Sequence, residues 1–123
     1  MFKTSHSLVA LSLLVAACGS EDEAPPPSPP ERIAALQGDA TNGQALYELH
    51  CQLCHAADGQ GDAATGGSSL VDNLPAQSDV ESIQVIYHGS EEDPLMIPFG
   101  ETGALSDQEI ADVYAYIKQT FEP

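Results

Sequence analysis

Five consecutive residues, Cys51-Gln52-Leu53-Cys54-His55, constrain this chain more than any other feature. Their pattern, C-x-x-C-H, is the attachment signature of a covalently bound haem. Cysteines three positions apart share one face of a helix, so both thiols can reach one edge of a porphyrin and form thioethers with its vinyl groups. His55 follows directly and can bind the iron as the proximal ligand. The sequence predicts one haem c, because no second C-x-x-C-H occurs.

The same residues are compatible with three other interpretations. A thioredoxin-like redox pair needs a βαβ setting, whereas the surrounding pattern is helical. A structural zinc site needs four ligands, and the spacing of His50, His55 and His88 supplies no second pair of the usual kind. A chance occurrence of the motif is the third alternative. The helical setting favours covalent haem.

The first seventeen residues have the pattern of an export signal, with Lys3 before the apolar run Leu8 to Ala17. Ten residues of helix cover about 15 Å, half of a bilayer core of about 30 Å, so this run is too short to span a membrane. The sequence Val15-Ala16-Ala17-Cys18 resembles the lipobox of bacterial lipoproteins, in which the cysteine is acylated. Lipid on Cys18 would also account for the odd number of cysteines.

The predicted location is therefore the periplasmic side of a bacterial membrane, reached through a lipid anchor. Gly19 and Ser20 do not match the inner-membrane retention signal, which favours the outer membrane. The alternative is ordinary cleavage after Ala17, which would give a soluble periplasmic protein.

We expect three segments: a signal peptide over 1–17, a linker over 18–37 and a haem domain over 38–123. The linker begins with the lipidated cysteine and is acidic and rich in proline. Proline runs favour extended polyproline II, at about 3.1 Å per residue, and such a composition cannot build a core. The linker is thus predicted to hold the domain away from the membrane.

The domain is predicted to be all-α, with three main helices and loops. Asp39, Thr41 and Asn42 offer N-caps to the first helix, which runs into the haem motif. Its expected apolar side is formed by Leu46, Leu49 and Leu53, with Tyr47 adjacent. Capping boxes at Ser78/Glu81 and Ser106/Glu109 begin the second and third helices, and Gly89 ends the second. The apolar residues of the third helix are Ile110, Val113, Tyr114, Ile117 and Phe121.

The chain has 19 acidic residues against three basic ones, a net charge of −16. This negative charge excludes nucleic acid as a partner, because the phosphate backbone is also negative and would be repelled. A redox protein with a basic docking face would be attracted to it, although the charge could equally serve only to keep the surface solvated. Salt screens such attraction over about 8 Å.

Met96 is the favoured sixth ligand of the iron. It lies between Pro94 and Pro98, in a stretch stiff enough to hold a thioether at a fixed place. Methionine ligation raises the haem reduction potential and suits an electron carrier. His88, near the end of the second predicted helix, and His50, just before the first cysteine, are the rival ligands.

With these motifs the chain resembles a class I, mono-haem cytochrome c of the bacterial type. The resemblance covers about residues 38 to 121. Its motifs are Gly43 to Tyr47 leading into Cys51 to Gly61, Ile86 to Gly89, Met96 to Gly100, and Leu105 to Ile110 continuing through Tyr116-Ile117.

This resemblance implies the small cytochrome c fold, with Cys51 and Cys54 attached to haem and His55 and Met96 as axial ligands. It also implies that the first and last helices cross, with Gly43 and Tyr47 facing Tyr116. One feature departs from the family. The Gly-Pro step that often supports the proximal histidine is absent from the matching stretch, 66–70. Some backbone carbonyl should still accept from the imidazole, and the sequence leaves open which one.

The predicted function is one-electron transfer by a membrane-tethered carrier, without catalysis of its own. One alternative is the haem subunit of a larger dehydrogenase or oxidase. Another is a haem sensor or enzyme with an open distal site, and a last is a lipoprotein whose motif is accidental.

Overall fold

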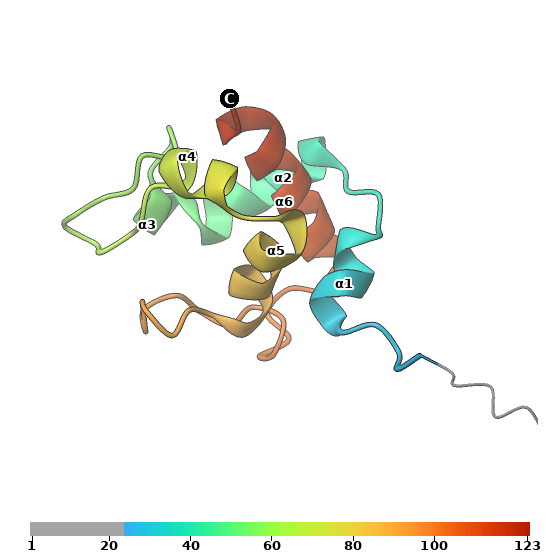
Figure 1. Ribbon diagram of the computed structural model, residues 1–123. Helices are drawn as coiled ribbons and strands as arrows, with labels where there is room; N and C mark the ends of the chain where they lie inside the picture. The colour runs from blue at the N-terminus through green and yellow to red at the C-terminus, as the bar shows by residue number, and fades with distance from the viewer. Residues whose placement is uncertain (1–23) are drawn as a thin grey trace, which may run out of the picture.

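The computed structural model describes residues 24–123. Their helices, in chain order, are α1 (Pro29–Ala34), α2 (Ala40–His50), α3 (Gln52–His55), α4 (Leu70–Asn73), the 3₁₀ turn η1 (Leu74–Ala76), α5 (Asp79–His88) and α6 (Asp107–Phe121) (Figure 1). The described part of the chain contains no β-strand, and one isolated bridge joins Asp62 and Gly67. The predicted all-α fold is confirmed.

The predicted signal segment, 1–17, and the predicted lipidation site, Cys18, lie outside the described residues. From residue 24 onward, no helix combines the length and the apolar character needed to cross a bilayer. Export and anchoring therefore stay predictions.

Helices α2 and α6 cross and make the most extensive helix–helix contact in the described chain (Figure 1). They meet at Gly43, where a Cβ atom would lie 2.9 Å from Cβ of Tyr116 and would collide with the carbonyl of Asp112. One turn later Tyr47 is completely buried, and its ring centroid lies 5.4 Å from that of Tyr116. The expected crossing at Gly43 and Tyr47 is confirmed.

A buried carboxylate reinforces this crossing. Asp112 of α6 is only 5% exposed and accepts three hydrogen bonds of 2.8 Å, from the backbone N–H of Asp39 and the side-chain amides of Asn42 and Gln108. Burial alone would raise the pKa of Asp112, but these donors outweigh it and hold the pKa below its ordinary value. The carboxylate thus joins the start of α2 to the middle of α6.

The helix starts were predicted correctly. The Asp39 side chain accepts from the N–H groups of the first turn of α2. Capping boxes at Ser78/Glu81 and Ser106/Glu109 begin α5 and α6. The apolar stripe of α6 is also confirmed, because all its predicted members are buried: Ile110, Val113, Tyr114, Ile117 and Phe121.

The predicted apolar side of α2 was wrong. Leu49 and Leu53 are 75% and 80% exposed, and Leu46 is only partly buried. The buried residues of this helix are Gly43 and Tyr47, because close approach to α6 requires a small residue and then an aromatic ring four positions later. The spacing of the leucines had predicted burial of a different face, next to the one that carries Gly43 and Tyr47.

The expected linker boundary also needs correction, since part of the 18–37 segment is folded. Helix α1 contacts α5 and α6, and its Ile33 is 1% exposed. Ser28 and Glu31 form a capping box, and Pro29 occupies the first helical position, where its missing N–H costs nothing. These local signals outweigh the proline-rich composition from which a linker was predicted.

Candidate cofactor site

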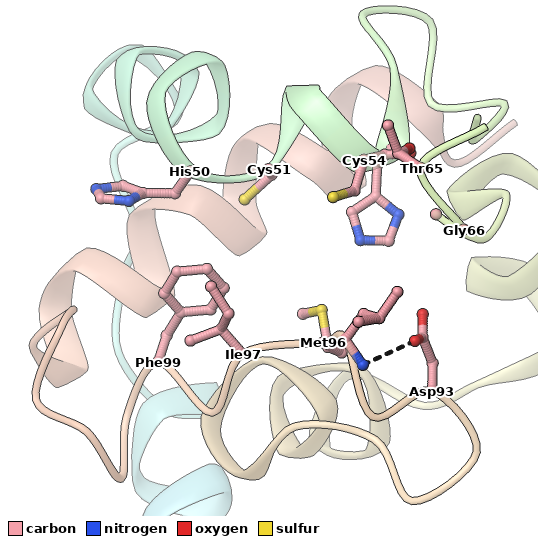
Figure 2. A pocket seen from close by; sticks show the side chains of 12 residues that line it. His50, Cys51, Cys54, Thr65, Gly66, Asp93, Met96, Ile97 and Phe99 are labelled. Carbon is pink, nitrogen blue, oxygen red and sulfur yellow. Dashed lines mark hydrogen bonds between the residues drawn. The ribbon is translucent and has the colours of Figure 1, made fainter. Parts of the chain in front are cut away.

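Two adjoining cavities, of about 460 and 50 Å³, separate the α2–α3 segment from residues 89–105, hereafter the methionine loop. Cys51, His55 and Met96 line both cavities, and Cys54 lines the smaller one. Figure 2 shows Cys51 and Cys54 on one side of this space and Met96 on the other. The structure therefore brings together the four residues predicted to hold a haem.

The two cysteines lie one helical turn apart, with Cys51 at the junction of α2 and α3 and Cys54 within α3. The N–H of His55 donates to the Cys51 carbonyl over 2.9 Å, which continues the helical turn through the motif. Both side chains are free thiols, and their sulfur atoms point toward the cavity (Figure 2). Burial, and to a lesser degree the neighbouring Cys54, raises the pKa of Cys51 to about 12, so this thiol keeps its proton at neutral pH.

The imidazole of His55 is held by a backbone carbonyl. Its Nδ1 lies 2.8 Å from the carbonyl oxygen of Ser68, to which a protonated Nδ1 donates. This leaves Nε2 free to bind a metal, the arrangement that orients ligating histidines in general. Ser68 therefore supplies the support for which the sequence offered no proline, and no side-chain pattern could have identified it.

The loop before Ser68 fits closely under α3. A Cβ atom on Gly67 would collide with the carbonyl of Cys54, so this position has no room for a side chain. Asp62 and Gly67 bond to each other in both directions, with N···O distances of 3.2 and 3.1 Å. Thr65 Oγ1 donates to the Asp62 carbonyl over 3.1 Å. This compact turn holds the Ser68 carbonyl within hydrogen-bond distance of the His55 imidazole.

The end of the C-x-x-C-H motif is attached to the core by Tyr47. Its hydroxyl donates to the carbonyl of Ala56 over 2.6 Å, and burial raises the pKa of this phenol. Ala56 has φ of 62°, a left-handed conformation that a residue with a Cβ atom adopts at some cost. The Tyr47 hydrogen bond stabilises the chain reversal directly after His55.

Met96 approaches the cavity from the methionine loop. Its N–H donates to the Asp93 carbonyl over 3.0 Å, and the Leu95 N–H donates to the Asp93 carboxylate over the same distance. The side chain is partly buried against the core. Phe99, three residues later, is 5% exposed and lines both cavities. In the sequence Phe99 was part of the motif Met96 to Gly100, but it was not identified as a wall of the site.

The rival histidines lie elsewhere. His88 is hydrogen-bonded to Glu101 over 2.6 Å and lines neither of the two cavities. His50 does line the smaller cavity, where its ring meets Phe99 edge-on at a centroid distance of 5.8 Å. Among residues 24–123, no three His, Cys, Asp or Glu side chains cluster as a metal-ion site of their own.

The residues present fit a covalent haem. Two free thiols point into the cavity, and an imidazole and a thioether can bind an iron between them. Apolar side chains form much of the larger cavity's wall, among them Leu70, Leu74, Ile86, Phe99 and Ile117. Such a wall can pack against the face of a porphyrin. At the smaller cavity, Leu95 and Ile97 are 68% and 52% exposed.

Residues 40–121, which run from α2 to the end of α6, match the family model of cytochrome c. The chain is 28% identical over 91 residues to a thiosulfate dehydrogenase of Psychrobacter arcticus, which covers 72% of this chain and 28% of that protein. It is 33% identical over 86 residues to a dihydro-haem d1 dehydrogenase of Pseudomonas aeruginosa, covering 70% of this chain and 16% of the relative. The chain thus spans a small part of either relative.

A solved structure has the same fold. The crystal structure of cytochrome cL from Hyphomicrobium denitrificans superposes with a TM-score of 0.54 at 22% sequence identity. The match covers 73% of this chain and 50% of that one.

Proposed function

This chain belongs to the cytochrome c family, an electron-transfer family with covalently bound haem c, and from that premise we propose a six-coordinate carrier whose iron is bound by His55 and Met96. The haem supplies a one-electron couple at its iron. Cys51 and Cys54 would attach it through thioethers, His55 would bind the iron through Nε2, and the Met96 sulfur would bind from the opposite side. With both axial positions filled by protein, the site transfers electrons without binding a substrate.

The observation that carries this proposal is the common cavity of His55 and Met96. Both side chains line the two cavities, and both motif cysteines line the smaller one. His55 is already oriented by Ser68 with Nε2 free, and Met96 lies in a loop braced by Asp93. A gas sensor or a haem enzyme would need a vacant position at the iron, which the proposed Met96 ligation would fill.

Replacing Met96 tests the ligand assignment. Met96→Ala should lower the reduction potential markedly, because axial ligands help set haem potentials over about 0.8 V. It should also abolish the far-red thioether–iron(III) absorption band and allow carbon monoxide to bind the reduced protein rapidly. Leu49→Ala, which shortens an exposed apolar side chain outside both cavities, is the control and should change none of these. An unchanged potential in Met96→Ala would refute the assignment.

We also propose that the domain is exported and tethered to a membrane through lipid on Cys18. The lipobox-like Val15 to Cys18 and the proline-rich stretch after it support this, with the linker now ending before Pro29, where α1 begins. More than one acyl chain would give stable anchoring. Cys18→Ser should move the protein from the membrane to the soluble fraction. If wild type and variant are both found in the soluble fraction, the protein is a soluble periplasmic one instead.

The partner is proposed to be a redox protein with a basic docking face. Two observations support it: the net charge of −16 and the exposed Leu95 and Ile97 beside the cavity, with the acidic run Glu91 to Asp93 just before them. Complementary charge of this kind mainly raises the association rate. Electron transfer to such a partner should therefore slow as salt is added, while transfer to a neutral small-molecule oxidant should not.

A second role, as the haem subunit of a larger dehydrogenase, is favoured by the names of the two relatives. Both are dehydrogenases of which this chain matches only 28% and 16% of the length. Purification of the native protein under mild conditions separates the two roles. A stable partner at fixed stoichiometry would indicate a subunit, and a lone monomer would indicate a free carrier.

A further inference from the structure

The methionine loop is built onto the C-terminus of α5. The last carbonyls of any helix lack partners within it. Here the N–H of Phe99 donates to the Ile86 carbonyl over 3.1 Å, and those of Gly100 and Glu101 donate to the Tyr87 carbonyl over 3.2 Å. The loop therefore caps α5 with its own backbone, directly after the segment that carries Met96.

The start of the same loop meets Met96 at the same helix end. Gly89 has φ of 80°, in the left-handed region that favours glycine, and its N–H donates to the Val85 carbonyl over 2.9 Å. A Cβ atom at Gly89 would lie 2.8 Å from the carbonyl oxygen of Met96. The start of the loop, its segment 99–101 and the backbone of Met96 thus converge on the last turn of α5.

One side-chain pair crosses from the helix to the loop. His88 Nδ1, on the last residue of α5, lies 2.6 Å from Glu101 Oε1. The imidazole also contacts the Tyr87 ring edge-on, with centroids 4.8 Å apart, so its orientation is fixed. In the described chain no other side-chain hydrogen bond joins α5 to this loop.

We propose that the His88–Glu101 pair is a positioning device that keeps the methionine loop closed and Met96 at the haem; this rests on the proposed role of Met96 as axial ligand. Neither side chain lines the two haem cavities, so the pair acts through the loop backbone. The backbone bonds that flank it, from Phe99 to Glu101, separate only if the loop lifts from α5. Removing the pair should therefore raise the fraction of molecules in which the loop is open.

An external ligand measures that fraction. Imidazole binds the ferric iron only when Met96 has left, so its apparent affinity rises in proportion to the open population. Both side chains are partly exposed, at 40% for His88 and 53% for Glu101, and pairs of this kind contribute modestly. We expect Glu101→Ala and His88→Ala each to tighten imidazole binding by about two- to fivefold.

Three further variants isolate the pair. The double variant should bind imidazole no more tightly than either single one, because the same interaction is lost once. Glu101→Gln, which keeps an acceptor for the imidazole N–H, should be intermediate. Glu91→Ala removes a carboxylate from the same loop that makes no bond to α5, and should match the wild type. If Glu101→Ala only matches Glu91→Ala, or if the single effects add in the double variant, the proposal is overturned.

A second readout does not depend on Met96 as ligand. The amides of Phe99, Gly100 and Glu101 should exchange hydrogen about two- to fivefold faster in Glu101→Ala than in wild type, with amides of α6 unchanged. Unchanged exchange at these amides would overturn the proposal even if Met96 binds the iron. A different outcome is faster exchange in Glu101→Ala together with no thioether–iron band in the wild-type protein. That result would support the loop-closing role of the pair and refute Met96 as the ligand.

Discussion

The Nδ1 atom of His55 lies 2.8 Å from the carbonyl oxygen of Ser68, so the imidazole is oriented by a backbone atom thirteen residues away. The carbonyl is held in place because Gly67 passes directly beneath α3, against the carbonyl of Cys54. A hydrogen bond at Nδ1 makes the other nitrogen a better donor to iron. The packing of one glycine thus influences the electronic character of the proposed proximal ligand.

Gly67→Ala should disturb this arrangement. The added methyl group has no space beneath Cys54, so the loop has to shift, at a cost of about 1–3 kcal/mol. A weakened bond at Nδ1 should raise the reduction potential, because a less basic imidazole stabilises ferric iron less. Potentiometry and urea unfolding check both effects. Ser68→Ala is the comparison, since it removes an exposed hydroxyl and keeps the backbone carbonyl that accepts from His55.

Gly43→Ala should separate α2 from α6. Its Cβ atom would collide with the Asp112 carbonyl and press on Tyr116 at 2.9 Å. We expect a loss of about 3 kcal/mol in the free energy of unfolding, at the upper end for an overpacked core. Urea unfolding of haem-loaded protein measures it. Gln44→Ala, at the next and exposed position, should change stability by no more than about 0.5 kcal/mol. Similar values for the two variants would contradict the close crossing.

Asp112→Asn should be destabilising in a pH-dependent way. At pH 7 the amide cannot accept all three hydrogen bonds made by the carboxylate, and we expect a loss of about 1–3 kcal/mol. The pKa of Asp112 is lowered on folding, so this stabilisation is present above the unfolded-state pKa of about 3.9 and is lost as the pH falls through the folded-state pKa.

The free-energy gap between wild type and Asp112→Asn should therefore narrow below about pH 4. Denaturant unfolding at pH 7 and pH 3 measures it, with the exposed Asp72→Asn as the control. A gap of constant size across this range would show that the carboxylate charge is not what stabilises the crossing.

Loss of both thiols should compromise folding. Cys51→Ser combined with Cys54→Ser prevents thioether formation, and a cavity of about 460 Å³ would then lack its covalently held occupant. A domain of this size buries a modest core on its own, and an empty apolar cavity costs stability. Circular dichroism should report reduced helix content and a less cooperative thermal transition. A native-like spectrum with sharp unfolding would contradict the interdependence of cofactor and fold.

Local signals in the sequence predicted the helix starts and the core of α6 correctly. Side-chain caps such as Ser78 and Ser106 act within one turn, and the stripe from Ile110 to Phe121 has the period of a helix with one buried face. The same logic failed at Leu49 and Leu53, because the buried side of α2 is set by its contact with another helix. Periodicity alone cannot choose between two faces of a short helix.

The candidate site was predictable where chemistry needs a particular side chain, as at Cys51, Cys54 and His55. The residues that hold these side chains in place could not be predicted. Ser68 acts through its carbonyl, and the His88–Glu101 pair joins residues that come together only after the loop has folded onto α5. Helix α1 could have been found, since Ser28 and Glu31 carry the same capping signal that identified the other helices.

The absorption spectrum of the oxidised and reduced protein, exported from a host that matures c-type cytochromes, tests the central claim most directly. A covalently bound haem with sharp bands when reduced, and a far-red thioether–iron(III) band when oxidised, is the result predicted for a His55–Met96 carrier. Covalent haem without the far-red band would contradict the role of Met96 and favour an open distal site. Absence of covalent haem would contradict the role of Cys51 and Cys54 and the account built on it.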